Sequence, residues 1–391
     1  MKFALILCLC GLFVFNSTVL AQPAQGYFTS EAKTVADNDH IIVSIKKYNP
    51  SDDEIKKAID PPKNAPMNYL QIPFAVTNAS LFNNGFESNL YCLDQSGNVI
   101  WTKALGYSKN SAASPIAVDD QFYYAGEGTK EGGKVQLQKI DRNGNVAWSK
   151  TFDSLDNVND ILIADNKVNA LVSFDASVKV MNKDKTFSYN VYPIYFFLQL
   201  DINTGAVITK QYQMMGNYLS SLGYGGPYIS SYQSYYLNKK DSAIFLNTTK
   251  QEGAITVSSD LKGSAITDLI AGPSEYHYLT LSKDKGYVLY SDFYGKEKKY
   301  TSNLPVKNNN NGMNRTALLQ SGDTMISVIN SGPDIDVCYT DYSGKSECST
   351  KKGLLTSYMA GVSLKGNKPY FIIVNGRDKP GMIGKMAVIF Y

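Results

Sequence analysis

The chain has 391 residues, of which 43% are hydrophobic and 19% charged, and its formal net charge is +3. This composition is ordinary for a folded soluble protein, and the length fits one large all-β domain or two small ones. Because no long basic run accompanies the small positive charge, nucleic-acid binding has no electrostatic support and no nucleic-acid partner is expected.

The first 21 residues have the pattern of a signal peptide. Lys2 gives a positive start, residues 3–15 are almost wholly apolar, and small residues precede a cut before Gln22. The apolar run is shorter than the ~20 residues that a membrane-spanning helix needs. We therefore expect a secreted or periplasmic protein that is soluble and has no membrane span after cleavage. A retained membrane anchor is the alternative.

The mature chain is expected to begin with a flexible segment followed by strands. Residues 22–39 are polar and low in apolar content, which predicts a flexible lead-in to a single domain over 40–391. Further on, apolar runs of four or five residues, such as 122–125, 161–164 and 370–374, are rich in aromatic and branched side chains. These runs predict short strands that are buried on both faces.

A tetrapeptide of Asp, two variable residues and Gly recurs along the chain. Asp can accept backbone N–H bonds at the first turn position, and Gly at the last can adopt a positive φ, so each copy predicts a hairpin turn. The copies begin at Asp94, Asp141, Asp260, Asp292 and Asp341, and a form one residue longer begins at Asp201. Their average spacing of roughly 49 residues is typical of the blades of a β-propeller.

Alignment on the glycines extends the repeat. Trp101 and Trp148, the only two tryptophans of the chain, each stand four residues after the Gly of a copy. Segments 93–103 and 140–150 are identical at six of eleven positions and nearly so at two more. In later copies other residues replace the Trp, so the repeat decays along the chain.

This unit resembles the repeat of the quinoprotein-type, or PQQ-like, β-propellers. The resemblance is specific over 90–106 and 137–153, moderate over 196–212 and weak beyond. In that family the Trp packs between neighbouring blades, which implies a blade-docking role for Trp101 and Trp148. Quinone catalysis is not implied, because the mature chain lacks the adjacent cysteine pair of the catalytic members. The resemblance therefore points to a non-catalytic branch.

The core runs predict an all-β propeller of seven blades, with six to eight open. The units lie near 67–106, 107–153, 154–215, 216–270, 271–303, 304–353 and 354–391. The last unit ends in the apolar strand 385–391, and the early strand 40–48 lacks a partner. Pairing these two strands would close the ring and leave no unpaired terminal edge.

Three cysteines remain after the predicted cleavage. Cys338 and Cys348 flank the Asp341 hairpin symmetrically, and opposed residues of an antiparallel pair are close enough to bridge when their side chains share a face. An exported protein would meet the oxidising conditions that permit this disulfide. Two separate thiols are the alternative. Cys92 is expected to be buried as a small hydrophobic residue.

The sequence contains few patterns that would indicate a catalytic or metal-binding site. His40 and His277 are the only histidines and are far apart, so no paired-histidine metal site is recognised, and no nucleophile-elbow motif exists. The acidic group Asp153, Asp156 and Asp160 matches no calcium loop and is interpreted as a turn. We therefore assign no catalytic residue, no cofactor and no metal.

Segment 217–236 carries six tyrosines among Gly and Ser residues. Rigid aromatic faces with polar tips make good contact surfaces for a glycan or a protein. Packing of these tyrosines between blades is the alternative. The candidate binding-surface residues are Tyr218, Tyr224, Tyr228, Tyr232, Tyr235 and Tyr236.

The sequence therefore predicts an exported, monomeric propeller that works as a binding or scaffold module for an unknown protein or glycan. Two alternatives stay open. One is an extracellular hydrolase or lyase acting on polysaccharide. The other is an outer-membrane assembly factor, similar to the envelope scaffold lipoproteins of the same superfamily.

Overall fold

The computed structural model describes eighteen segments of the chain, and every regular element within them is a β-strand. The all-β prediction is confirmed for these residues. The described segments are 25–48, 86–108, 113–129, 133–164, 166–181, 187–213, 224–230, 233–238, 243–248, 252–256, 264–271, 275–282, 286–293, 299–304, 315–331, 334–352, 358–375 and 384–391.

The strands are numbered in chain order. The first twelve are β1 (Gln25–Ala36), β2 (Ile41–Tyr48), β3 (Phe86–Leu93), β4 (Val99–Ser108), β5 (Ile116–Val118), β6 (Phe122–Gly128), β7 (Lys134–Asp141), β8 (Val146–Asp153), β9 (Asn157–Ala164), β10 (Lys167–Met181), β11 (Phe187–Asp201) and β12 (Val207–Gln213). The next eight are β13 (Tyr224–Ser230), β14 (Gln233–Asn238), β15 (Ala243–Thr248), β16 (Glu252–Thr256), β17 (Ser264–Ala271), β18 (Glu275–Ser282), β19 (Gly286–Phe293) and β20 (Lys299–Asn303). The last seven are β21 (Arg315–Ser321), β22 (Thr324–Ser331), β23 (Asp334–Asp341), β24 (Ser346–Lys351), β25 (Tyr358–Lys365), β26 (Lys368–Asn375) and β27 (Gly384–Phe390).

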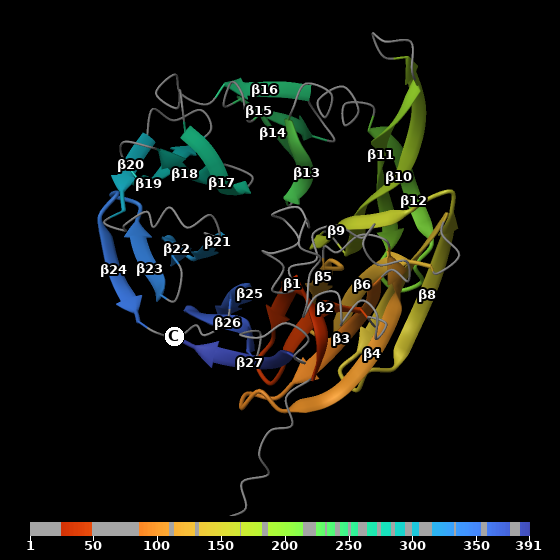
Figure 1. Cartoon of the computed structure of the whole chain (residues 1–391), viewed down its shortest axis with the longest axis horizontal. Helices are drawn as coiled ribbons and strands as arrows, with labels where there is room; N and C mark the ends of the chain where they lie inside the picture. Colours follow the sequence, from red (N-terminus) through yellow and green to blue (C-terminus); the bar gives the residue numbers. More distant parts are fainter. Residues whose placement is uncertain are drawn as a thin grey trace, which may run out of the picture.

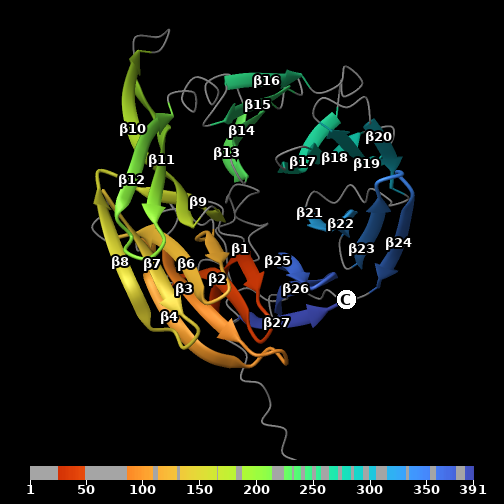
Figure 2. The same ribbon diagram turned by 180° about the vertical axis from the view of Figure 1, so that it is seen from behind.

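These strands form five separate four-stranded antiparallel sheets and one seven-stranded sheet of order β25-β26-β27-β1-β2-β3-β4. Figure 1 shows the sheets arranged around a common centre, with β13 and β21 innermost in their sheets and β16 and β24 outermost. Figure 2 shows the same ring from behind. This arrangement of four-stranded sheets is that of a β-propeller.

The Asp-to-Gly tetrapeptides form the predicted turns where the structure describes them. In the copies at Asp94, Asp141 and Asp341, the Gly N–H donates to the carbonyl of the Asp, at 2.9 to 3.0 Å. Gly97, Gly144 and Gly344 have φ near +85°, a conformation that glycine adopts without steric cost. The longer copy at Asp201 closes in the same way, with φ +67° at Gly205. The turn glycines of the copies at Asp260 and Asp292 lie outside the described residues.

The apolar core consists of layers between neighbouring sheets. In β2, Ile41, Val43 and Ile45 pack in the layer shared with β26 and β27, while Ile42 packs on the opposite side with β3, β5 and β6. In β22, Met325 and Ile329 face β18 and β19, while Ile326 and Val328 face β26. The prediction that the short strands are buried on both faces is therefore confirmed for β2 and β22.

Strand β1 corrects two sequence predictions. Residues 25–36 form this strand where the sequence predicts part of a flexible lead-in over 22–39. β1 pairs with β2, and its first residues pair with β27 through Gln25↔Lys385 and Gly26↔Gly384. The predicted pairing of strand 40–48 with 385–391 is therefore wrong, because β1 lies between these two strands.

The polar composition of β1 explains why the sequence did not predict this strand. Ala32 is small enough to be buried, and Thr34 satisfies its hydroxyl inside the structure. The Thr34 Oγ1 donates to the carbonyl of Ile42 at 3.0 Å and shares a hydrogen bond of 2.7 Å with the hydroxyl of Tyr370 on β26. A strand whose polar groups are paired in this way needs no apolar run, and for that reason the sequence pattern missed it.

A buried ion pair joins the first two sheets. The Lys46 ammonium on β2 lies 2.9 Å from Glu127 Oε2 on β6, with side chains 3% and 4% exposed. The hydroxyls of Ser88 and Ser114 donate to the same oxygen at 2.5 and 2.6 Å, and the N–H of Gly128 donates to Oε1 at 2.8 Å. Buried charges are tolerated only when they are paired and fully hydrogen-bonded, so this cluster fixes how the two sheets meet.

We predict that Glu127→Gln lowers the free energy of unfolding by about 3 kcal/mol, because it leaves the Lys46 charge buried without its counter-ion. Denaturant unfolding of both proteins measures the loss. Glu347→Gln is the matched control, since its pair with Lys345 is 79% and 72% exposed and should contribute little. Equal effects of the two substitutions would contradict this account of the cluster.

Candidate functional site

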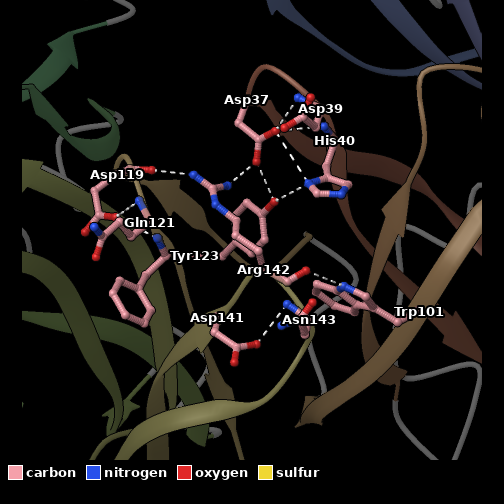
Figure 3. Close-up of polar contacts among 11 residues, drawn as sticks. Asp37, Asp39, His40, Trp101, Asp119, Gln121, Tyr123, Asp141, Arg142 and Asn143 are labelled. Carbon is pink, nitrogen blue, oxygen red and sulfur yellow. Dashed lines mark hydrogen bonds and ion pairs between the residues drawn. The ribbon is translucent and has the colours of Figure 1, made fainter.

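Turns of the first two sheets meet in a polar cluster (Figure 3). Asp37 follows β1, and its Oδ1 accepts the backbone N–H groups of Asp39 and His40 at 2.8 and 2.7 Å. Its Oδ2 accepts the hydroxyl of Tyr123, at 2.5 Å, and is paired with the guanidinium of Arg142. Tyr123 and Arg142 belong to the second sheet and its β7–β8 turn, so one carboxylate ties two sheets together.

The second sheet repeats this design. Asp119 follows β5, and its Oδ1 accepts the N–H groups of Gln121 and Phe122 at 2.8 and 2.7 Å. Its Oδ2 accepts the hydroxyl of Tyr124 at 2.6 Å. The guanidinium of Arg142 donates to the Asp119 carbonyl at 2.8 Å and lies 4.4 Å from the centre of the Tyr123 ring. Arg142 therefore connects both turns.

The hydrogen bonds keep these carboxylates ionised. Burial alone would raise the pKa of Asp37, but hydrogen bonds from Tyr123, His40 and Asp39, together with the Arg142 charge, bring it below its usual value. For Asp119, burial likewise opposes hydrogen bonds from Tyr124, Gln121 and Phe122, and its pKa is also lowered. Each carboxylate uses its lone pairs to hold a turn, so we interpret both as structural groups.

The two tryptophans contact the next sheet in the same way. The indole N–H of Trp101 on β4 donates to the carbonyl of Arg142 at 3.1 Å, and that of Trp148 on β8 donates to the carbonyl of Ile202 at 3.1 Å. Both acceptors directly follow the Asp of a turn. Each ring lies against the turn glycine: a Cβ built on Gly144 or Gly205 would stand 3.0 Å from the indole.

The candidate disulfide is present. Cys338 on β23 and Cys348 on β24 are directly opposed and joined, with their Cα atoms 4.0 Å apart. The bond closes the hairpin around Asp341 at the outer edge of its sheet. Cys92 is a buried free thiol, and burial raises its pKa to about 12, so it is uncharged at neutral pH.

The tyrosine-rich segment supplies β13 and β14, the two inner strands of the four-stranded sheet β13–β16 (Figure 1). The register places Tyr228 opposite Tyr235, Tyr236 opposite Pro227 and Tyr224 opposite Asn238. Tyr218 and Tyr232 lie outside the described residues. Tyr228 and Tyr235 are thus cross-strand neighbours on the two inner strands of this sheet.

The remaining ionisable candidates have structural surroundings. His277 is fully buried in β18, where its Nδ1 shares a 2.6 Å hydrogen bond with Ser291 and its ring stacks on Tyr342. Asp156 accepts the backbone N–H groups of Gly133 and Asp175 at 3.2 and 2.8 Å, as a turn residue would. Within the described segments, no group of three or more His, Cys, Asp or Glu side chains could hold a metal ion. The same segments contain no helix long and apolar enough to cross a membrane.

Sequence reasoning missed Asp37, Asp119, Tyr123 and Arg142. The signal they leave is weak, because an Asp before a strand and an Arg within a turn are common. Tyr123 and Arg142 lie on another sheet than Asp37, and only the fold brings these three residues together.

No family model matches the chain, and no curated protein matches it significantly. Solved structures do resemble it in fold. Puromycin hydrolase aligns with a TM-score of 0.52 and 10% identity, over 95% of this chain and 53% of its own length. AztD from Citrobacter koseri aligns with a TM-score of 0.41 and 9% identity over 77% and 95% of the two chains. The dihydro-heme d1 dehydrogenase NirN aligns with a TM-score of 0.42 and 10% identity over 77% and 71%. At these identities the likeness concerns the fold alone.

We predict that Gly144→Ala destabilises the protein more than Gly366→Ala does. Both glycines have positive φ, +86° and +58°, but only a Cβ at Gly144 meets a neighbour, the Trp101 ring. The shared backbone strain costs about 1 kcal/mol, and the clash adds about 1 to 2 kcal/mol at Gly144. Denaturant unfolding of each glycine variant, in the wild-type and the Trp101→Ala background, measures the backbone cost and the additional cost of the clash. If the extra cost persisted without the indole, the contact would not be its cause.

We predict that the stabilising effect of the Tyr124 hydroxyl depends on pH. The pKa of Asp119 is lower in the folded state than its usual value, so its contribution is present at neutral pH and lost as the pH falls below about 4 and through the folded pKa. The stability difference between wild type and Tyr124→Phe should therefore shrink below pH 4. Tyr339→Phe, which removes no hydrogen bond to a described carboxylate, is the control. A difference independent of pH would rule out the Asp119 linkage.

Proposed function

We propose that the chain is an exported seven-bladed β-propeller that serves as a rigid binding or scaffold module. The seven-stranded sheet divides at the short β27–β1 contact into β25–β27 and β1–β4. Together with the five four-stranded sheets, this division supports seven blades. The pairing of β1 with β27 supports closure of the ring by the two ends of the domain.

The binding proposal is supported by the contacts that hold neighbouring blades together. Asp37 and Asp119 hold turns, and the Lys46–Glu127 pair joins two blades. Such a frame keeps the strand order and the loops around its centre in fixed positions. Rigid scaffolds that present loops and aromatic residues are suited to recognition, because little conformational entropy is lost on binding.

Export is supported by two independent features. The first 21 residues have the charge and apolar pattern of a signal peptide. The Cys338–Cys348 disulfide is expected in an oxidising compartment rather than in a cytosol. We therefore place the mature protein in the periplasm or outside the cell.

The ligand surface that we propose is the tyrosine-rich pair β13 and β14, with Tyr228 and Tyr235 at its centre. Tyrosine combines an apolar ring with a polar tip, which suits a glycan or a protein surface. No cofactor is needed for this role.

We predict that mass spectrometry of the exported protein finds a mature N-terminus at Gln22. The charge of Lys2, the apolar core and the small residues before Gln22 favour cleavage there. Recovery of the intact N-terminus in a membrane fraction would contradict export as a soluble protein.

We predict that the mature chain captures a glycan or protein ligand from glycan arrays and envelope extracts. The double variant Tyr228→Ala/Tyr235→Ala should bind it at least about tenfold more weakly, because central aromatic residues dominate binding energy. Tyr278→Ala/Tyr290→Ala, which removes a cross-strand tyrosine pair from β18 and β19, is the matched control. Equal binding by both folded variants would remove the surface from consideration.

A further inference from the structure

Strands β10 and β11 extend far beyond their sheet. They pair along their whole length, from Lys167↔Asp201 to Met181↔Phe187. β9 pairs with β10 only as far as Ser173, and β12 pairs with β11 only from Tyr195 onward. Residues 174–181 and 187–194 therefore continue as a two-stranded ribbon, here called the arm. At 3.3 Å per residue the arm is about 26 Å long, and Figures 1 and 2 both show it running out from the ring.

The β10 edge of the arm has no partner strand among the described segments. The N–H of Asp175 points away from β11, because it donates to Asp156 Oδ2 at 2.8 Å. Backbone direction alternates along a strand, so the N–H groups of Ser177 and Lys179 point the same way. No strand of the described segments pairs with them. The other edge carries Pro193, which has no N–H to donate.

The end of the arm is also exposed. Among the described large hydrophobic residues, Met181 and Phe187 are the most exposed, at 65% and 57%. They are directly opposed, and the Lys179 ammonium lies 3.9 Å from the centre of the Phe187 ring. A two-stranded ribbon is only marginally stable in water by itself, so a third strand on the open edge would stabilise it.

We propose that this edge is a self-association surface, on which the β10 edge of a second copy pairs antiparallel to form the sheet β11-β10-β10-β11. A two-fold pairing centred near Ser177 brings Asp175 of each copy beside Lys179 of the other. Both side chains are exposed. This proposed dimer replaces the monomer that the sequence analysis expected.

The charges explain why a second copy fits this edge. A lysine on an edge strand opposes pairing with a strand that offers no acid. The second copy offers Asp175, and each Lys179 then meets a carboxylate. Partial desolvation of its carboxylate by nearby atoms and the neighbouring Asp156 charge raise the pKa of the otherwise exposed Asp175, so this carboxylate gains from a nearby cation. The Asp175 N–H can stay bonded to Asp156 while its carbonyl accepts from the partner strand.

Sedimentation velocity of the mature chain over a concentration series tests the proposal. Wild type should self-associate reversibly, and Lys179→Asp or Asp175→Lys alone should weaken association about tenfold, since each replaces two opposite-charge contacts by two like-charge contacts. Lys352→Asp, at an exposed lysine that directly follows β24, is the control for net charge and should behave as wild type.

Mixing the two charge variants gives the decisive result. A heterodimer of Lys179→Asp with Asp175→Lys restores both opposite-charge contacts, so the mixture should associate as strongly as wild type. This outcome cannot arise from misfolding of either variant. A wild type that stays monomeric at every concentration, charge variants that associate like wild type, or a mixture no stronger than its components would each overturn the proposal.

Discussion

The contact between the turn of one sheet and the outer strand of the sheet before it sets how the sheet of β1–β4 and the sheets β5–β8 and β9–β12 are placed. Trp101 donates to Arg142 and packs on Gly144, and Trp148 donates to Ile202 and packs on Gly205. The glycine is needed twice at each site, because it takes the positive φ of the turn and leaves room for the indole. Since the contact recurs between successive sheets, one small motif fixes their relative placement.

Polar contacts also hold neighbouring sheets together. Asp37 and Asp119 each bind the backbone of their own turn and a tyrosine hydroxyl, and Asp37 also binds Arg142 of the next sheet. Near the other end of the strands, Lys46 pairs with Glu127, and Ser88, Ser114 and the Gly128 N–H also donate to the Glu127 carboxylate. Between these two levels lie the apolar layers to which β2 contributes both faces. Each sheet is therefore stabilised mainly by its neighbours.

Much of this fold can be predicted from the sequence because the turn signal is local. The Asp-to-Gly spacing identifies hairpins, and the symmetric placement of Cys338 and Cys348 around one of them identifies a possible disulfide. Strand β1 was missed because its polar side chains are satisfied by partners such as Tyr370, more than 300 residues away in sequence. The Asp37–Tyr123–Arg142 cluster was missed for the same reason. Local patterns reveal turns, whereas long-range hydrogen bonds become visible only in the fold.

The central claim is that neighbouring sheets depend on the turn-to-indole contact. Native-state hydrogen exchange, resolved by peptide, on wild type and Trp148→Ala tests it most directly. The account predicts that loss of this one indole lowers protection in both β5–β8 and β9–β12, because each sheet loses the neighbour that shields it. Loss of protection confined to β8 itself would contradict the account.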